Sequence, residues 1–397
     1  MRQLINPRSY APPLRLLAKR HISFGTRQAA LRNTVDEIDA RLDIAQFRRI
    51  TRAAEDRLKA VVFRRQAQPG AFLRPDSIVK QPVVLPALAK WFIRDQQGQS
   101  MGLSRHFKQF KPSIVPYELV FGEGGLPGEA DDSAVAFRDW LREKSPHLLK
   151  RRLSQVLARH ETGDEQLDAY TDFVRFDAPL GLLDAALQYN SSLELRGHLK
   201  PVSQLYIAQA SLSDLPQDLQ LDVPTPQALV APPTPQVPYT ADIYDSSLWL
   251  GLEPTFTPWH RDPNHNLFCQ LCGSKTVRLL PPEAGARLFK KVMSRLGSTG
   301  DNVAIRGVEM MRGAERQAWQ DGIWGPDAPP FILETVVHPR DVMFIPKGWW
   351  HSVKSTGGGE GTLNASVNWW FRWRDPSTRT FNGGANTDPS ASLGGGS

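Results

Sequence analysis

The feature that most constrains the fold is a triplet, His260-Arg-Asp262, together with a single histidine, His351, far along the chain. On a β-strand, residues i and i+2 point to the same face, so His260 and Asp262 would project together. For His351 to join them, two strands that are distant in the sequence must lie side by side. Two imidazoles and one carboxylate, with the remaining positions open, form the arrangement that suits non-haem Fe(II). The triplet alone is weak evidence, because a lone His-x-Asp is usually surface polarity or a satisfied structural pair, so its surroundings decide.

The C-terminal half of the chain reads as a β-sheet protein. From Ser203 onward, short strand-like runs alternate with turn residues, as a β-sandwich or barrel requires. The Pro-rich stretch 216–238 is too long for a minimal turn and would be either a lid or a passive linker. Helical spacing around Ala284–Leu296 predicts a helix inside the long segment 280–331. The tail, residues 377–397, is rich in Gly, Ser, Asn and Thr and is predicted to be disordered.

The N-terminal half favours helices. Thr34-Val-Asp-Glu37 fits a capping box, and apolar residues recur about every 3.6 positions from Val35 to Val61, which predicts an amphipathic helix within residues 34–75. Gln81-Pro-Val-Val-Leu85 is predicted to be a short buried strand. Further helices, which would buttress the sheet, are predicted near 87–95, 133–158 (interrupted at Pro146) and 178–188.

The positive charge is concentrated at the N-terminus. The chain has 48 Lys and Arg residues against 41 Asp and Glu residues, a net charge of +7. Residues 1–35 hold seven of these cations and no acid, so the rest of the chain is balanced. An Arg-rich, acid-free leader is typical of an organelle transit peptide, and Arg20-His-Ile22 before Ser23 resembles a mitochondrial processing site. We therefore predict a mitochondrial transit peptide over residues 1–33; the alternative is a basic arm on a cytoplasmic protein.

Composition excludes several classes of protein. A chain of 397 residues with 41% hydrophobic content can bury a substantial core. No apolar run approaches the ~18 residues that a membrane-spanning helix needs, so no membrane insertion is expected. The two cysteines, Cys269 and Cys272, allow neither a disulfide framework nor a four-cysteine zinc site. Their spacing matches a redox or zinc motif, but positions i and i+3 of a strand face opposite ways, which predicts buried thiols.

Motifs around the triplet follow one another in a fixed order. Thr257-Pro-Trp-His260-Arg-Asp262 continues through Pro263-Asn-His-Asn266 to Gly273-Ser-Lys275, and Pro339-Arg-Asp341 precedes Ile345-Pro-Lys-Gly-Trp-Trp-His351. This succession, from about Tyr206 to Phe371, resembles the Jumonji-C (JmjC) oxygenases, in particular their small cupin-type protein hydroxylases. The resemblance implies an α+β, mainly β fold: a double-stranded β-helix (jelly-roll) barrel at 201–376, a helical buttress at 76–200, and flanking N-terminal helices.

The resemblance also assigns the cofactor and cosubstrate residues. His260, Asp262 and His351 would bind Fe(II). Alternation after the turn at Gly273 places Lys275 on the face of Val277 and Leu279, where an ammonium is costly unless it meets an anion. By resemblance that anion is the distal carboxylate of 2-oxoglutarate, to which Thr257 and Tyr206 would donate further hydrogen bonds. The alternative is a lysine whose head group extends out to solvent from the turn.

Four further residues are candidates by resemblance. Asn266 and Asn368 lie in otherwise apolar strands, and buried amides need partners. They would surround the metal-bound end of 2-oxoglutarate or the oxygen site, unless neighbouring backbone satisfies them. Gln209 and Trp249 match positions near the cosubstrate and the substrate pocket, respectively. His265 is close enough to compete as a metal ligand, but its odd offset from His260 makes it the poorer choice.

One residue departs from the family pattern. JmjC proteins usually have Gly in the turn before the last ligand strand, where this chain has Arg340. Arginine would be strained in a turn that needs a positive φ at that position, so the type of turn stays open.

The resemblance implies an Fe(II)- and 2-oxoglutarate-dependent dioxygenase that uses O₂ and releases succinate and CO₂. Hydroxylation of a protein side chain is our first hypothesis. The alternatives are a tRNA nucleoside hydroxylase of the same family and a cupin-fold scaffold without turnover. A body that is near neutral once the leader is removed disfavours tRNA and DNA as partners. Histone demethylation is less favoured because two cysteines cannot build a reader-domain zinc cluster. Separately, the flanking helices could form the contact face of a homodimer.

Overall fold

The structure, a computed structural model, describes most of the chain between residues 34 and 375. The predicted leader (1–33), the predicted tail (377–397) and Pro146 lie outside the described residues. Within the described part of the chain, no helix has both the length and the apolar character needed to cross a membrane. The described ranges are 34–64, 81–94, 101–120, 132–144, 151, 153–155, 173–193, 200–296 and 313–375.

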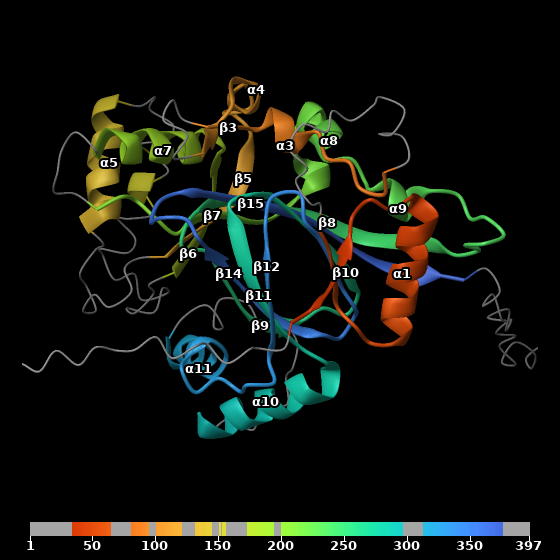
Figure 1. The fold of residues 1–397 in the computed structure, drawn as a ribbon. Coiled ribbons are helices and arrows are strands. Elements are labelled where there is room, and N and C mark those ends of the chain that lie inside the picture. The colour runs from red at the N-terminus through yellow and green to blue at the C-terminus, as the bar shows by residue number, and fades with distance from the viewer. Residues whose placement is uncertain are drawn as a thin grey trace, which may run out of the picture.

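Eight strands, β8 to β15, form two facing antiparallel sheets at the centre of the molecule (Figure 1). The order is β13-β10-β15-β8 in one sheet and β12-β11-β14-β9 in the other, so the chain passes from sheet to sheet at nearly every step. This arrangement confirms the predicted double-stranded β-helix core. The strands are β8 (Thr240–Leu252), β9 (Phe256–Arg261), β10 (His265–Cys272), β11 (Ser274–Leu280), β12 (Leu333–Val337), β13 (Val342–Ile345), β14 (Trp350–Thr356) and β15 (Leu363–Arg374).

The sheet that contains β10 is extended at both edges. β2 pairs with β13 and β1 pairs with β2 in parallel, while β7, β5 and β6 continue the sheet beyond β8. The extension gives nine strands and covers both edges of the central four. The added strands are β1 (Asp36–Asp39), β2 (Val61–Arg64), β5 (Ile114–Val120), β6 (Phe173–Pro179) and β7 (Leu205–Ser211); β3 (Phe92–Arg94) and β4 (Met101–Leu103) form a separate hairpin.

The predicted helix over 34–61 was wrong in its N-terminal part. Residues Asp36–Asp39 form β1, and α1 spans Ile44–Asp56 before the chain returns to the sheet as β2. The capping box is formed further along the chain than expected, by Asp43 and Gln46: Gln46 N donates to Asp43 Oδ1 at 2.7 Å, and Asp43 N donates to Gln46 Oε1 at 2.9 Å. Pairing with β2 gives β1 long-range hydrogen bonds that helical periodicity cannot register.

Other N-terminal predictions agree only in part. Residues 81–85 form no strand, and the Pro82 carbonyl instead accepts a hydrogen bond from Ala228 N. The helix predicted for 87–95 ends at Lys90, after which the chain forms β3. Helices do occur near the other predicted positions. Besides α1, the helices of this half within the described ranges are α3 (Ala87–Lys90), α4 (Arg105–Lys108), α5 (Asp132–Lys144) and α7 (Gly181–Leu193).

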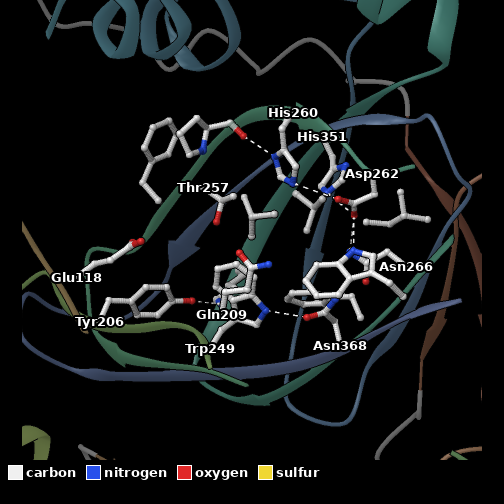
Figure 2. A pocket seen from close by; sticks show the side chains of 18 of the residues that line it. Glu118, Tyr206, Gln209, Trp249, Thr257, His260, Asp262, Asn266, His351 and Asn368 are labelled. Atoms are coloured by element: carbon white, nitrogen blue, oxygen red, sulfur yellow. Dashed lines mark hydrogen bonds and ion pairs between the residues drawn. The ribbon is translucent and has the colours of Figure 1, made fainter. Parts of the chain in front are cut away.

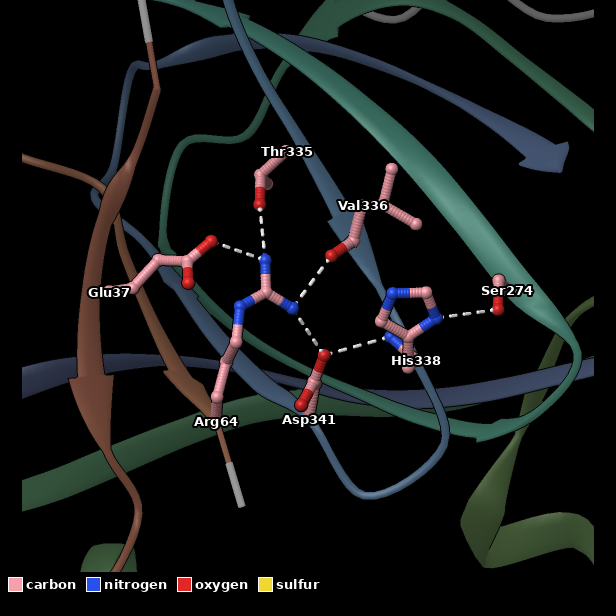
Figure 3. Close-up of polar contacts among 7 residues, drawn as sticks. All are labelled: Glu37, Arg64, Ser274, Thr335, Val336, His338 and Asp341. Carbon is pink, nitrogen blue, oxygen red and sulfur yellow. Dashed lines mark hydrogen bonds and ion pairs between the residues drawn. The ribbon is translucent and has the colours of Figure 1, made fainter. Parts of the chain in front are cut away.

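Arg64 joins the N-terminal strands to the barrel (Figure 3). Its Nη1 donates to Asp341 Oδ2 at 2.7 Å and to the Val336 carbonyl at 2.9 Å, and its Nη2 donates to Glu37 Oε1 at 2.5 Å and to Thr335 Oγ1 at 3.1 Å. Four acceptors from two separate parts of the chain therefore converge on one guanidinium, which fixes β1 and β2 against the turn before β13.

Three hydrophobic clusters hold these layers together. The largest lies between the nine-stranded sheet and the N-terminal helices, and the second fills the space between the two sheets. The third packs α10 (Pro282–Arg295) and α11 (Gly313–Trp324) against Trp259 and Trp350 on the outer face of the four-stranded sheet, below the barrel in Figure 1. The helix predicted around Ala284–Leu296 is thus confirmed, whereas α11 was not predicted.

The Pro-rich stretch 216–238 is neither a lid nor a loose linker. It folds into α8 (Gln217–Asp222) and α9 (Gln227–Val230), after a short 3-10 helix at Leu212–Asp214, and it contacts α1, α3 and β8. Leu219 and Ala228 are fully buried there, and the buried Arg48 guanidinium donates to the carbonyls of Ala231 and Pro232. The stretch therefore acts as packing for the N-terminal helices.

The turn that carries Arg340 requires a positive φ. Asp341 N donates to the His338 carbonyl at 2.9 Å, and Arg340 has a φ of +83°, which are the features of a type II turn with Pro339 at its second position. A residue with a Cβ is strained in this region of φ. The Arg340 side chain is exposed, so a substitution that removes it costs few packing contacts.

We predict that Arg340→Gly raises the free energy of unfolding by about 1 kcal/mol, because it relieves the left-handed strain. Urea unfolding followed by circular dichroism measures the change. Arg340→Ala is the matched control: it shortens the side chain but keeps a Cβ, so it should give no such gain. A glycine variant no more stable than the alanine variant would contradict the strain argument.

Candidate metal centre and cosubstrate cavity

A cavity of about 210 Å³ lies between the two sheets of the barrel (Figure 2). Strands of both sheets contribute to its wall, and its inner part is apolar, with Val277, Ile345 and Val353 among the lining side chains. The structure brings together at this cavity all ten residues singled out in the sequence: Tyr206, Gln209, Trp249, Thr257, His260, Asp262, Asn266, Lys275, His351 and Asn368.

His260, Asp262 and His351 converge at one end of the cavity. β9 and β14 are adjacent antiparallel strands, and His351 pairs directly with His260 in their register. Asp262 follows the last residue of β9. The potential ligand atoms of the three side chains all lie within 4.8 Å of one another: His260 Nε2 is 3.9 Å from Asp262 Oδ1, and His351 Nε2 is 3.6 Å from Asp262 Oδ2. Movements of less than about 1 Å would bring all three onto one ion, because metal–nitrogen distances are about 2.1 Å.

Backbone carbonyls orient both imidazoles. His260 Nδ1 lies 2.8 Å from the Pro258 carbonyl, and His351 Nδ1 lies 3.1 Å from the Trp349 carbonyl. A carbonyl can only accept, so each Nδ1 carries the proton and each Nε2 keeps its lone pair for a metal. Burial lowers the pKa of His351 to about 4, assisted by the neighbouring His260 and opposed by Asp262. His351 is therefore neutral at physiological pH, as a metal ligand must be.

The carboxylate of Asp262 is held by two donors on the same oxygen. Asn266 Nδ2 donates to Oδ2 at 3.0 Å and Trp370 Nε1 donates to it at 2.9 Å. Among the described residues, these bonds leave Oδ1 available on the side of His260. Hydrogen bonds that orient a carboxylate in this way are the usual support of a metal ligand.

Two buried amide atoms at the cavity lack a partner among the described residues. Asn266 uses its Nδ2 on Asp262, which leaves its Oδ1 without a hydrogen bond. Asn368 Oδ1 accepts from Trp249 Nε1 at 2.8 Å, which leaves its Nδ2 without one. Buried polar atoms are normally satisfied, so each of these marks a place where a bound polar group fits.

Lys275 is buried at the cavity wall without an anion. Its side chain is 3% exposed, and its Nζ donates to Ser366 Oγ at 2.7 Å and to Tyr206 Oη at 3.0 Å. No carboxylate of the described residues lies within ion-pair distance of it. Burial lowers the pKa of Lys275 to about 7, and the charge of Glu253 only partly opposes this shift. The head group therefore points inward, contrary to the alternative of a lysine extended into solvent.

Strand irregularities aim two further side chains at the cavity. Simple alternation would put Thr257 and His260 on opposite faces of β9, but the register between β9 and β14 shifts so that Thr257 pairs with Val353 while His260 pairs with His351. The bulge places both on the cavity face. Gln209 stands at a second bulge, in β7, with a φ of +54°, and it lines the cavity although it is exposed.

Sequence reasoning missed four residues of this site. Ser366 and Trp370 share the face of Asn368 on β15, so alternation from Asn368 could have found them. Glu118 and Arg175 come from β5 and β6, which were not predicted. Arg175 donates to Glu118 Oε1 through Nε at 2.8 Å and through Nη2, and burial raises the pKa of Glu118 against the lowering by Arg175.

The two weaker motifs have structural roles. Cys269 and Cys272 are free and buried, as predicted, and burial raises the pKa of both thiols. The alternation behind that prediction was wrong, however, because a bulge between Gln270 and Cys272 turns both cysteines to the same face of β10. His265 is fully buried and contacts Glu55 and the main chain of Lys347, so it does not compete with the triad.

Comparisons with known proteins agree with this geometry. A family model described as a cupin-like domain matches residues 126–376, more than half of the chain. Similar curated proteins include the lysine-specific demethylase JMJ30 of Arabidopsis thaliana (25% identical over 173 residues), the JmjC domain-containing protein D of Dictyostelium discoideum (30% over 121 residues) and the Jumonji C domain-containing protein 5 of Drosophila melanogaster (27% over 137 residues).

The similarity covers part of each protein. The matched segments are 43%, 29% and 33% of this chain and 34%, 23% and 29% of the respective relatives. The chain thus spans about a third or less of the length of these relatives. With the family model, the double-stranded β-helix and the His-Asp-His cluster in agreement, the chain belongs to the cupin-like family of JmjC-domain proteins.

Proposed function

We propose that this protein is an Fe(II)- and 2-oxoglutarate-dependent dioxygenase that hydroxylates a protein side chain. The observation that carries the proposal is that a three-ligand metal site and a buried lysine without an anionic partner among the described residues line the same cavity. JmjC proteins use Fe(II) and 2-oxoglutarate, and each of these groups has residues of the right chemistry here.

The triad fits Fe(II). His260, Asp262 and His351 offer two imidazole nitrogens and one carboxylate oxygen, the donor set of non-haem iron oxygenases, and the open cavity side leaves room for further ligands. A structural zinc site would instead be closed by four protein ligands. The cluster in this cavity has three such ligands among the described residues, which favours a site at which small molecules bind.

The opposite wall fits a dicarboxylate. An ammonium with two hydroxyl neighbours, Tyr206 and Ser366, would form charge-assisted hydrogen bonds with a distal carboxylate. The unpartnered Nδ2 of Asn368 is a donor for an oxygen of the same molecule nearer the metal. A lysine at one place and a metal at another would hold a five-carbon 2-oxo diacid in a single orientation, and a monocarboxylate would leave Lys275 unpaired.

When bound, Fe(II) with 2-oxoglutarate and O₂ supplies oxidative decarboxylation to succinate and CO₂, coupled to insertion of one oxygen atom into a C–H bond. The residues of this chain bind, orient and exclude water. Trp370 and Asn266 fix the Asp262 carboxylate, the carbonyls of Pro258 and Trp349 fix the imidazoles, and the apolar wall keeps bulk water from the cavity. None of these groups has to take up a proton during the reaction.

The names of similar proteins are what points to a basic side chain as the substrate class. Among the described lining residues, the acids are Asp262, which belongs to the triad, and Glu118. Glu118 is paired with the guanidinium of Arg175, which also lines the cavity, so the charge of this carboxylate is already balanced. Similar proteins such as JMJ30 are named as lysine-specific demethylases, which is in keeping with a basic substrate residue.

The test is transfer of labelled oxygen. Mitochondrial extract is incubated with the iron-loaded protein, 2-oxoglutarate and isotopically labelled O₂, and peptides are analysed by mass spectrometry. We expect labelled oxygen on a lysine or arginine side chain with the wild type and none with Asp262→Asn. Release of formaldehyde with loss of a methyl group would indicate demethylation instead, and label in tRNA nucleosides without label in protein would contradict the proposed substrate class.

A further inference from the structure

His265 connects α1 to the loop that carries the last metal ligand. The imidazole is fully buried between the rings of Phe344 and Phe371, whose centroids lie 5.4 and 5.5 Å away. One ring nitrogen, Nδ1, accepts a hydrogen bond from Lys347 N at 3.0 Å, and the other, Nε2, lies 3.0 Å from Glu55 Oε1 on α1. A buried polar side chain that spans two elements in this way fixes their relative position.

These contacts define the state of the ring. A main-chain N–H can only donate, so Nδ1 of His265 is unprotonated and Nε2 carries the proton; Glu55 Oε1 lies 3.0 Å from Nε2 as an ion-pair contact, outside hydrogen-bond geometry. Although burial raises it, the pKa of Glu55 is held at about 2 by His265 and by Arg52. Glu55 is therefore an anion at physiological pH, and it orients the imidazole so that Nδ1 is presented to Lys347.

The loop from Pro346 to Trp349, which joins β13 to β14, touches two of the three metal ligands. Gly348 N donates to the Asp262 carbonyl at 2.8 Å, and the Trp349 carbonyl accepts from His351 Nδ1 at 3.1 Å. Gly348 has a φ of +77°, so the loop has a specific backbone conformation that needs to be held. The hydrogen bond from Lys347 N to His265 anchors the loop to β10, and Lys347 Nζ also lies 3.7 Å from Glu55 Oε1, a direct contact between the loop and α1.

We propose that Glu55 and His265 are positioning residues for the metal centre: they hold the Pro346–Trp349 loop, and through it Asp262 and His351, in the ligating arrangement. Neither residue touches the metal site itself. The inference rests on the proposed function, since it presumes that the triad binds a metal. Glu55 lies outside residues 126–376, so α1 becomes part of the catalytic unit although the family model does not include it.

The experiment compares isosteric variants in the full chain, with Co²⁺ as an oxygen-stable probe whose visible absorption reports both affinity and coordination geometry. Asn places an oxygen where His265 has Nδ1, so His265→Asn can still accept from Lys347 N, whereas the amide of His265→Gln reaches the position of Nε2. Glu55→Gln keeps an acceptor for His265 and Glu55→Ala removes it. Arg52→Ala, which removes another partner of Glu55, controls for damage to α1.

The expected result is a Co²⁺ affinity about tenfold weaker in His265→Gln and about threefold weaker in Glu55→Ala, with an altered absorption band in both. His265→Asn, Glu55→Gln and Arg52→Ala should bind like the wild type. If the buried His265 variants fail to fold, the two Glu55 variants decide, because Glu55 lies at the edge of the core with a side chain that is 15% exposed.

Two failures are distinguishable. A wild type that binds Co²⁺ no better than Asp262→Asn would overturn the proposed function, and with it the basis of this inference. A wild type that binds through the triad, with folded His265→Gln or Glu55→Ala giving the same affinity and the same absorption band, would overturn the positioning role alone.

Discussion

Replacing Asp262 with asparagine is expected to abolish Fe(II) binding while leaving the fold intact. The amide keeps the shape of the carboxylate and one oxygen that can accept from Trp370 Nε1, but it loses the negative charge that balances the metal. Because Asp262 is the one charged member of the triad and is 4% exposed, its contribution is not screened by solvent. We expect the affinity for Fe(II) to fall by about a thousandfold, beyond the ~100-fold upper range seen when a supporting residue is lost.

Anaerobic equilibrium dialysis with Fe(II) measures this effect, and thermal unfolding shows whether the variant is folded. Asp245→Asn is the matched control, since Asp245 is an exposed carboxylate of β8 that does not line the cavity. Asn266→Ala should give an intermediate loss, about 10- to 100-fold, because it removes a hydrogen bond to Asp262 and no ligand. Unchanged iron binding by folded Asp262→Asn would remove Asp262 from the site.

Lys275→Met is expected to stabilise the ligand-free protein. Keeping a lysine whose pKa falls from 10.5 to about 7 on burial costs on the order of 5 kcal/mol at neutral pH. Methionine avoids this cost and has a similar volume. However, it removes the hydrogen bonds from Nζ to Tyr206 and Ser366, and each lost bond reduces the gain in stability by about 1 kcal/mol. The net expectation is a gain of about 2–3 kcal/mol in the free energy of unfolding, measured by urea titration.

The same substitution is expected to weaken 2-oxoglutarate binding by about a hundredfold or more, because the carboxylate of the cosubstrate would lose its buried cation. Stability and binding thus move in opposite directions, which a general disturbance of the fold would not produce. Lys290→Met, on the exposed side of α10, is the control and should change neither quantity. A Lys275→Met variant that is destabilised, or one that binds 2-oxoglutarate like the wild type, would contradict the role of Lys275.

The pKa of Lys275 also sets a pH dependence. The unfolded chain keeps this proton up to about pH 10.5, whereas the folded ligand-free protein releases it near pH 7. Unfolding therefore takes up a proton between these values, and the stability of the wild type rises with pH across this window relative to Lys275→Met. Binding of 2-oxoglutarate requires the ammonium, so its dissociation constant is constant below pH 7 and rises up to about tenfold per pH unit above it.

The β-rich character of the C-terminal half could be predicted from local signals, whereas the double-stranded β-helix and the roles of most site residues were implied by the resemblance to JmjC proteins. Strand-like runs with turn residues between them define β8 to β15, and the ligand types at His260, Asp262 and His351 imply that β9 and β14 are neighbours. Alternation put Lys275 on the face of Val277 and Leu279, and the resemblance to JmjC proteins favoured the inward direction of its head group. These inferences hold because the side-chain period of a strand is fixed wherever one face is buried.

The remaining features depend on pairing between distant segments. β1, β2, β5 and β6 gain their stability from the edges of the sheet, and Asp36–Asp39 is a strand only because β2 lies beside it. Glu118 could not be recognised as a cavity residue without β5. Bulges are a second cause: one shifts Thr257 onto the face of His260, and another puts Cys269 and Cys272 on one face, which alternation in an unbroken strand excludes.

The most direct test of the central claim is succinate formation from 2-oxoglutarate by anaerobically iron-loaded protein after O₂ is admitted, with Asp262→Asn and Lys275→Met measured in parallel. We predict succinate in amounts that depend on O₂ and iron from the wild type, increased by extract that contains the substrate, and none above background from either variant. A wild type that binds neither iron nor 2-oxoglutarate and forms no succinate with extract present would contradict the account and leave a JmjC barrel that serves as a scaffold.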